Sequence, residues 1–286
     1  MRFLPIAGLL AAMASFQLGA SFAERLFPMV GPAGAAALRL LGSSLILAIV
    51  RRPWRGLAGR PPAPALIGYG VSLGAMNTLF YLALARLPLG IAVAVEFVGP
   101  LGVAMAASRR PLDLAWIALA VGGLLLLLPL GLEAHSVDPI GVALALAAGG
   151  CWAMYILFGR RAGQAHGGHA TGLGVFIATL VFLPPQVALQ GHALFPLAAL
   201  PLALIVALLS SALPYSLEMY ALTRVPTRVF GTLMSLEPAV GALAGLTLLG
   251  QHLSLLQWSG ISAVMAASLG AALAHGSAEE EPPQPV

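Results

Sequence analysis

The chain has 286 residues, of which 59 % are apolar and only 8 % are charged. Soluble domains carry about 25 % charged residues, so these few ionic side chains could not cover a water-facing surface of this size. The composition excludes a soluble enzyme, a nucleic-acid-binding protein and a disordered chain, and it indicates that the surrounding solvent is lipid. The single cysteine, Cys151, excludes an intrachain disulfide.

Ten apolar segments follow one another along the chain, separated by proline, glycine and arginine. A membrane-spanning helix needs about 20 apolar residues, so this length has room for about ten helices and little else. We therefore predict an all-α integral membrane protein with short connections. The ten predicted spans cover residues 3–23, 33–50, 65–85, 90–107, 114–131, 139–158, 171–189, 197–220, 228–249 and 255–275.

The arginines are unequally distributed between the two sides of these spans. If the N-terminus lies inside, eleven arginines are in inner connections, whereas only Arg25 and Arg86 are in outer ones. An excess of arginine on the cytoplasmic side sets the orientation of membrane proteins. The distribution predicts that both termini are cytoplasmic, which also requires an even number of spans.

Polar residues share faces of spans 1 and 3. Gln17 and Ser21 lie in the outer half of span 1, and Asn77 and Tyr81 lie one turn apart in span 3. Such hydrogen-bonding faces suit a small polar or zwitterionic solute. Hydrogen bonds that merely hold the helices together explain any one of these residues equally well.

Spans 2 and 4 each contain an ionisable residue, Arg39 and Glu96. Each lies about six residues from the outer end of its span, which at ~1.5 Å per residue is a depth of about 9 Å. Burying such groups in a membrane costs about 2.5 kcal/mol or more, so each is a functional candidate. An ion pair between them is geometrically possible, and a purely structural link between the two helices is the alternative.

Spans 8 and 9 contain the carboxylates Glu218 and Glu237, and Tyr215 lies on the same face as Glu218. Two carboxylates at similar depth in a low dielectric cannot both ionise cheaply, so one of them is expected to hold a proton. We predict that this pair binds and releases protons. The alternative is that Glu218 extends toward Arg224 or Arg228 and is only structural.

Two prolines interrupt spans 4 and 9. Pro100 removes the hydrogen bond to the carbonyl of Glu96, and Pro238 does the same at Met234. The positions predict kinks in two related helices that act as gates, although a kink that serves packing is the simpler interpretation.

The two halves of the chain resemble each other. Residues 83–88 read ALARLP and residues 221–226 read ALTRVP, and at the same offset of 138 residues Pro100 aligns with Pro238. With five spans in each copy, the second copy is inverted in the membrane, an arrangement typical of secondary transporters. We predict a first repeat over 1–135, a second over 136–276 and a disordered acidic tail over 277–286.

Several long segments also have a distinctive order of residues. They are MASFQLGASFA (13–23), GVSLGAMN (70–77), PLGIAVAVEFVGPL (88–101), LPYSLEMYALTRVPTR (213–228) and FGTLMSLEPA (230–239). These segments resemble the threonine/homoserine exporter family of the EamA-type drug/metabolite transporters. The resemblance implies two inverted five-helix repeats in a bacterial inner membrane, and efflux of small amino acids by proton antiport without a cofactor. The chain departs where many EamA-type repeats have Leu-Gly-Glu, because it has the neutral Gln251, which cannot carry a proton.

Together these features predict a proton-coupled exporter in which the substrate carboxylate pairs with Arg39 and its ammonium with Glu96. The expected partners are a small zwitterionic amino acid, protons and the lipid bilayer, with no metal, cofactor or nucleic acid. An exporter of another metabolite or drug is the main alternative, and an intramembrane enzyme or a channel is less favoured. The residues expected to bind substrate are Arg39, Glu96, Asn77, Tyr81, Gln17, Ser21 and Tyr215; Glu237 and Glu218 carry protons, and Pro100 and Pro238 act in gating.

Overall fold

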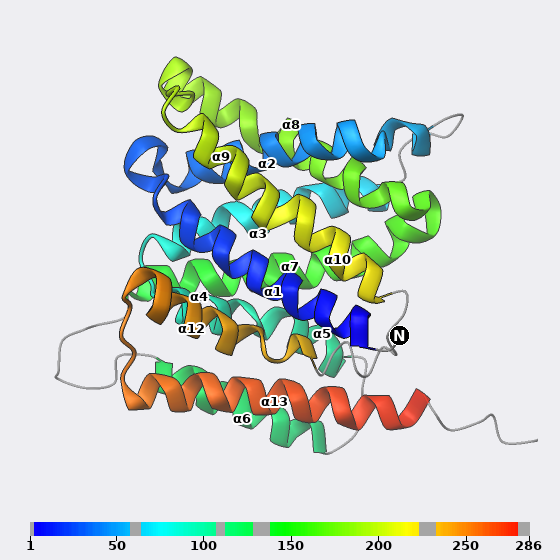
Figure 1. Ribbon diagram of the computed structural model, residues 1–286. Coiled ribbons are helices and arrows are strands. Elements are labelled where there is room, and N and C mark those ends of the chain that lie inside the picture. The colour runs from blue at the N-terminus through cyan, green and yellow to red at the C-terminus, as the bar shows by residue number, and fades with distance from the viewer. Residues whose placement is uncertain (1–2, 58–63, 107–111, 128–137, 223–232, 280–286) are drawn as a thin grey trace, which may run out of the picture.

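The computed structural model describes residues 3–57, 64–106, 112–127, 138–222 and 233–279. All regular structure in these ranges is helical, and the helices pack side by side in one bundle (Figure 1). The helices are α1 (Phe3–Glu24), α2 (Phe27–Arg51), α3 (Pro64–Leu84), α4 (Leu89–Glu96), α5 (Val98–Ala106), α6 (Leu112–Leu127), α7 (Pro139–His166), α8 (Ala170–Gln190), α9 (Leu200–Ala207), α10 (Leu213–Leu222), α12 (Glu237–Leu249) and α13 (Leu255–Glu279).

Every predicted apolar segment overlaps one of these helices or a consecutive group of them. Four helical stretches are long and apolar enough to cross a membrane, and one of these, Pro139–Leu194, runs through both α7 and α8. The shorter apolar helices include Leu89–Val103 and Leu255–Ala271. The chain is thus the all-helical membrane protein that the composition predicts. Residues 277–279 of the expected tail continue α13, and the rest of that tail lies outside the described residues.

Helices from the two halves of the chain pack against one another throughout the bundle. At one edge α6 lies beside α13, and α2 pairs with α8 at the opposite edge (Figure 1). Between them α4 contacts α12, while α3 packs against α7 and α1 packs against α10. When the five spans of each half are matched in chain order, α1 corresponds to α7 and α3 corresponds to α10. Exchanging the two halves therefore converts the α3–α7 contact into the α1–α10 contact.

Glycines allow two helices to touch at their backbones. Gly99 of α5 packs against Gly149 of α7, and a Cβ atom on Gly149 would lie 2.5 Å from the carbonyl oxygen of Glu96. Small residues at such crossings let membrane helices approach closely. This contact fixes the position of the α4–α5 junction, and therefore of Glu96, relative to α7.

Several helices are interrupted near the middle of the chain's apolar segments. The helix of predicted span 4 breaks between α4 and α5 at Phe97, three residues before Pro100, whose missing N–H leaves the carbonyl of Glu96 without a helical partner. Helix α12 begins at Glu237 with Pro238 in its first turn, where no N–H is needed. Both breaks place a carboxylate at a helix end.

Two further departures from regular helix were not predicted. Gly31 in α2 has a φ of 70°, so the regular part of this helix begins at Pro32. Between α9 and α10, residues Leu208–Ala212 form a wider π-helical turn, η4. Such turns occur frequently at functional sites.

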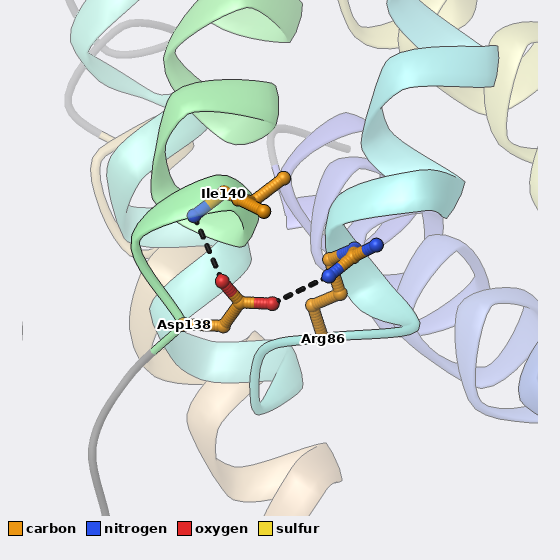
Figure 2. A network of polar contacts seen from close by, with 3 residues as sticks. All are labelled: Arg86, Asp138 and Ile140. Atoms are coloured by element: carbon orange, nitrogen blue, oxygen red, sulfur yellow. Dashed lines mark hydrogen bonds and ion pairs between the residues drawn. The ribbon is translucent and has the colours of Figure 1, made fainter.

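An ion pair joins the α3–α4 connection to the start of α7. Arg86 Nη1 lies 2.7 Å from Asp138 Oδ2, and Asp138 also accepts a hydrogen bond from the backbone N–H of Ile140 (Figure 2). Asp138 therefore caps the N-terminus of α7 as well as binding Arg86. The hydrogen bond from Arg86 and the helix cap lower the pKa of Asp138 from its ordinary value.

Candidate functional site

A cavity of about 440 Å³ lies among side chains of both halves of the chain. Its walls come from α1, α2, α3, α4, α5, α7, α8, η4, α10, α12 and α13. Most of the lining is apolar, with a few polar groups between, which is the usual composition of a small-molecule site. The polar residues that line it are Gln17, Arg39, Asn77, Glu96, Tyr155, Thr171, Ser210, Tyr215, Glu218, Glu237 and Ser268.

Arg39 is held in place by the π-helical turn η4. Its Nη2 donates to the backbone carbonyl of Ser210 at 2.6 Å, and its Nε donates to Ser211 Oγ at 3.3 Å. The neighbouring carbonyl of Leu209 accepts from Ser15 Oγ at 2.7 Å. A π turn disturbs the regular i to i+4 pairing, so its carbonyls are available to side-chain donors. Arg39 is 6 % exposed and its guanidinium lies over the ring of Tyr81, 5.5 Å from the centroid.

The three acidic residues Glu96, Glu218 and Glu237 all line the same cavity. The expected ion pair between Arg39 and Glu96 is absent, because Arg39 binds η4 instead; Arg86 and Asp138 form the salt bridge seen within the described ranges. Glu96 and Glu237 are 7 % and 6 % exposed, and each stands at a helix break. The cavity thus has one cation on one wall and carboxylates on others.

Three polar atoms of this cavity are buried without a hydrogen-bond partner in the described part of the chain. They are Gln17 Oε1, Ser210 Oγ and Glu237 Oε2. Buried polar atoms in native proteins are nearly always satisfied by protein, water or ligand. Because these atoms belong to residues from three separate segments that line one cavity, we interpret them as groups awaiting a polar ligand.

Aromatic rings form much of the remaining wall. Phe16 packs edge-on against Tyr215 with centroids 5.4 Å apart, and Phe97 packs likewise against Trp152 at 5.7 Å. The ring of Tyr155 stacks on the ring of Tyr69 in α3. These bulky side chains restrict the space around the polar groups, which favours a small solute.

Most of the predicted site residues meet at this cavity, and three stand just behind it. Ser21 donates to the backbone carbonyl of Gln17 at 2.8 Å, Tyr81 is fully buried beneath Arg39, and Pro238 follows Glu237 in the first turn of α12. The predicted residues that line the cavity are Gln17, Arg39, Asn77, Glu96, Pro100, Tyr215, Glu218 and Glu237.

Sequence reasoning missed several residues of the lining, namely Ser210, Thr171, Ser268, Tyr155 and Trp152. A serine pair in an otherwise apolar segment is a signal that could have identified Ser210. Trp152 aligns with Phe16 in the internal repeat, and both residues line the cavity.

Gln251 lies outside the cavity and connects three segments at one end of the bundle. Its Oε1 accepts from the backbone N–H of Leu89 at 2.8 Å, and its Nε2 donates to Glu24 Oε1 at 3.3 Å. It thereby caps α4 and binds the end of α1. Both contacts together require a side chain that donates and accepts, which a carboxylate cannot do.

Comparison with known proteins decides the family. The profile of the EamA-like transporter family matches residues 139–273. The threonine/homoserine exporter RhtA of Escherichia coli (strain K12) is 54 % identical over 271 residues, which are 95 % of this chain and 92 % of that protein. The chain belongs to the EamA-like transporters. It is a bacterial membrane transporter and not an enzyme.

Two further similarities agree with this placement in the EamA-like family. The exporter of the same name from Salmonella typhimurium (strain SL1344) is 53 % identical over the same shares of the two chains. A chain known from a crystal structure superposes with a TM-score of 0.56 at 19 % identity and covers 98 % of both chains. At that identity the structural likeness concerns the fold alone.

Proposed function

We propose that this chain exports small zwitterionic amino acids, with threonine and homoserine as leading substrates. The identity to exporters named for these two amino acids supports the substrate class. The observation that carries the proposal is the cavity itself, where buried Arg39 and buried carboxylates are placed on different walls of a small space. Charges in the interior of a membrane protein are costly and mark substrate or ion pathways.

The substrate carboxylate binds Arg39. A guanidinium has five N–H donors, and two of them are used by Ser210 and Ser211. The remaining donors have the planar geometry that carboxylates match. The ammonium group binds the acidic wall of the cavity, where Glu96, Glu218 and Glu237 lie.

Alternating access arises from two inverted five-helix repeats, residues 1–135 and 136–276. The contact between α3 and α7 becomes the contact between α1 and α10 when corresponding helices of the two halves are interchanged. This symmetry of the contacts supports the division into two repeats. The helix breaks beside Pro100 and Pro238 lie on the cavity and are suitable hinges for gating. In a bacterial inner membrane, the arginine distribution supports a topology with both termini in the cytoplasm.

Protons are carried by Glu237 and Glu218, so that export is antiport. Both carboxylates line the substrate cavity, which lets a proton and a substrate compete for the same groups. Arg224 and Arg228, the structural alternative partners of Glu218, lie outside the described residues. Competition at one site is sufficient for exchange, because the empty carrier returns only after it has bound a proton.

The coupling is tested in proteoliposomes that contain labelled L-threonine and face an imposed pH gradient. The wild type is expected to move threonine against its concentration gradient, whereas Glu237→Gln is expected to exchange threonine more slowly and to lose all response to the gradient. A matched control is Glu24→Gln, since Glu24 lies outside the cavity. Gradient-driven transport by Glu237→Gln at the wild-type rate would remove Glu237 from the coupling mechanism.

A further inference from the structure

The acceptor atoms of Gln17 and Glu237 form a distinctive pair in the cavity. Gln17 Oε1 and Glu237 Oε2 are both buried and without a donor in the described part of the chain, and the two residues are 4 % and 6 % exposed. A carbonyl oxygen and an ionised carboxylate oxygen both accept hydrogen bonds, so neither can donate to the other while Glu237 is ionised. In that state the pair is incomplete until a group with at least two donors lies between or beside the two oxygens.

Gly241 lets the side chain of Gln17 approach α12, the helix that begins at Glu237. A Cβ atom on Gly241 would lie 3.4 Å from Gln17 Oε1, so the amide of Gln17 approaches α12 at that residue. Gly241 is four residues after Glu237 and on the same face of the helix. Helix α1 packs against α12, and Gln17 and Glu237 both line the same cavity.

We propose that Gln17 and Glu237 together bind the ammonium group of the transported amino acid. The inference rests on the proposed function and refines it, because it replaces Glu96 by a specific pair of oxygens from α1 and α12. An ammonium offers three donors and no acceptor, which complements two acceptors and a negative charge.

This arrangement makes a free amino group a condition of binding. Arg39 holds the carboxylate from α2, and Gln17 and Glu237 hold the ammonium from α1 and α12. A ligand without the ammonium leaves both oxygens unsatisfied in a water-poor cavity, so the site discriminates against it. For the same chain length, 3-hydroxybutanoate is the counterpart of threonine that lacks only this group.

The test measures equilibrium binding of labelled L-threonine to the purified full-length protein, and its displacement by 3-hydroxybutanoate. The variant Gln17→Leu removes the carbonyl at nearly constant volume and is expected to weaken threonine binding about tenfold or more, since it loses a hydrogen bond to a charged group. Its binding of 3-hydroxybutanoate is expected to stay at the weak wild-type level. Gln190→Leu, at the end of α8 outside the cavity, is the control and is expected to bind like the wild type.

Equal threonine affinity in Gln17→Leu and the wild type would overturn the inference and leave the proposed function in place. A wild type that binds no amine-bearing amino acid at all would overturn both. If thermal unfolding shows that Gln17→Leu does not fold, the test uses Gln17→Asn instead. This side chain is shorter by one methylene, so its carbonyl lies farther from the ligand. Weakened threonine binding with unchanged 3-hydroxybutanoate binding in that variant supports the pair, and unchanged threonine binding refutes it.

Discussion

Arg39 shows how a single residue gains a geometry that suits a substrate. Its hydrogen bonds to Ser210 and Ser211 fix the guanidinium on the wall of the cavity, and the ring of Tyr81 lies beneath it. A side chain anchored in this way does not lose further freedom when a carboxylate binds. The same anchoring explains why Arg39 stands apart from Glu96 in this conformation.

The substitution Arg39→Lys is expected to reduce threonine exchange at least tenfold. A lysine keeps the charge, but its compact ammonium cannot bind both η4 and a carboxylate with the planar donors of a guanidinium. The measurement is the initial rate of threonine exchange in proteoliposomes at equal protein content. Arg86→Lys serves as the control, because Arg86 lies in an exposed ion pair outside the cavity. Equal rates for both variants would contradict the role given to Arg39.

At the scale of residues, the sequence identified the ionisable groups of the cavity because charge is so rare in this chain. Glu96, Glu218 and Glu237 were predicted on that ground, and all three line one space. The hydrogen-bond partners of Arg39 could not be predicted, since they depend on a backbone carbonyl that only the π turn makes available. Ser210 is therefore visible as a partner only in the structure.

At the scale of elements, prolines made the breaks beside Glu96 and Glu237 predictable. A proline lacks a donor wherever it occurs, so its effect on a helix follows from the sequence alone. The π turn between α9 and α10 contains no proline and was not predicted. The carbonyl of Ser210 and the hydroxyl of Ser211 accept hydrogen bonds from Arg39 of α2, which is a tertiary effect that helix propensity does not reveal.

The close crossing of α5 and α7 gives a stability prediction. Gly149→Ala would put a Cβ atom 2.5 Å from the carbonyl oxygen of Glu96, and this backbone atom cannot move as the end of a side chain can. The cost is expected to be about 1–3 kcal/mol. The midpoint of thermal unfolding in detergent measures it. Gly150→Ala is the matched control, since a Cβ there meets no atom within 4 Å; equal midpoints for both variants would contradict the account.

The ends of α1, α4 and α12 are joined through Gln251, which gives a second prediction at this scale. Gln251→Glu removes the hydrogen bond donated to Glu24 and sets two carboxylates together, so unfolding should occur at lower temperature, at a cost of about 1 kcal/mol or more. The double substitution Glu24→Gln with Gln251→Glu restores one donor facing one acceptor and should recover most of the loss. A double variant as unstable as Gln251→Glu would show that the contact is unimportant.

At the scale of the whole molecule, the apolar composition and the number of apolar segments were sufficient to predict the all-helical membrane fold. The pairing of helices was not predictable in detail, because it depends on contacts such as Gly99 on Gly149 and Gly90 on Ala242 that no local pattern reveals. The internal repeat did indicate that helices from the two halves belong together. The cavity lies among those shared contacts, which is why its residues are scattered along the whole chain.

The central claim is that the cavity carries a small zwitterionic amino acid across the membrane. Counterflow of labelled L-threonine into proteoliposomes preloaded with unlabelled amino acids tests it most directly. We expect preloaded threonine or homoserine to drive transient accumulation of label, and 3-hydroxybutanoate to drive none. Accumulation driven equally by 3-hydroxybutanoate, or no accumulation with any amino acid, would contradict the account.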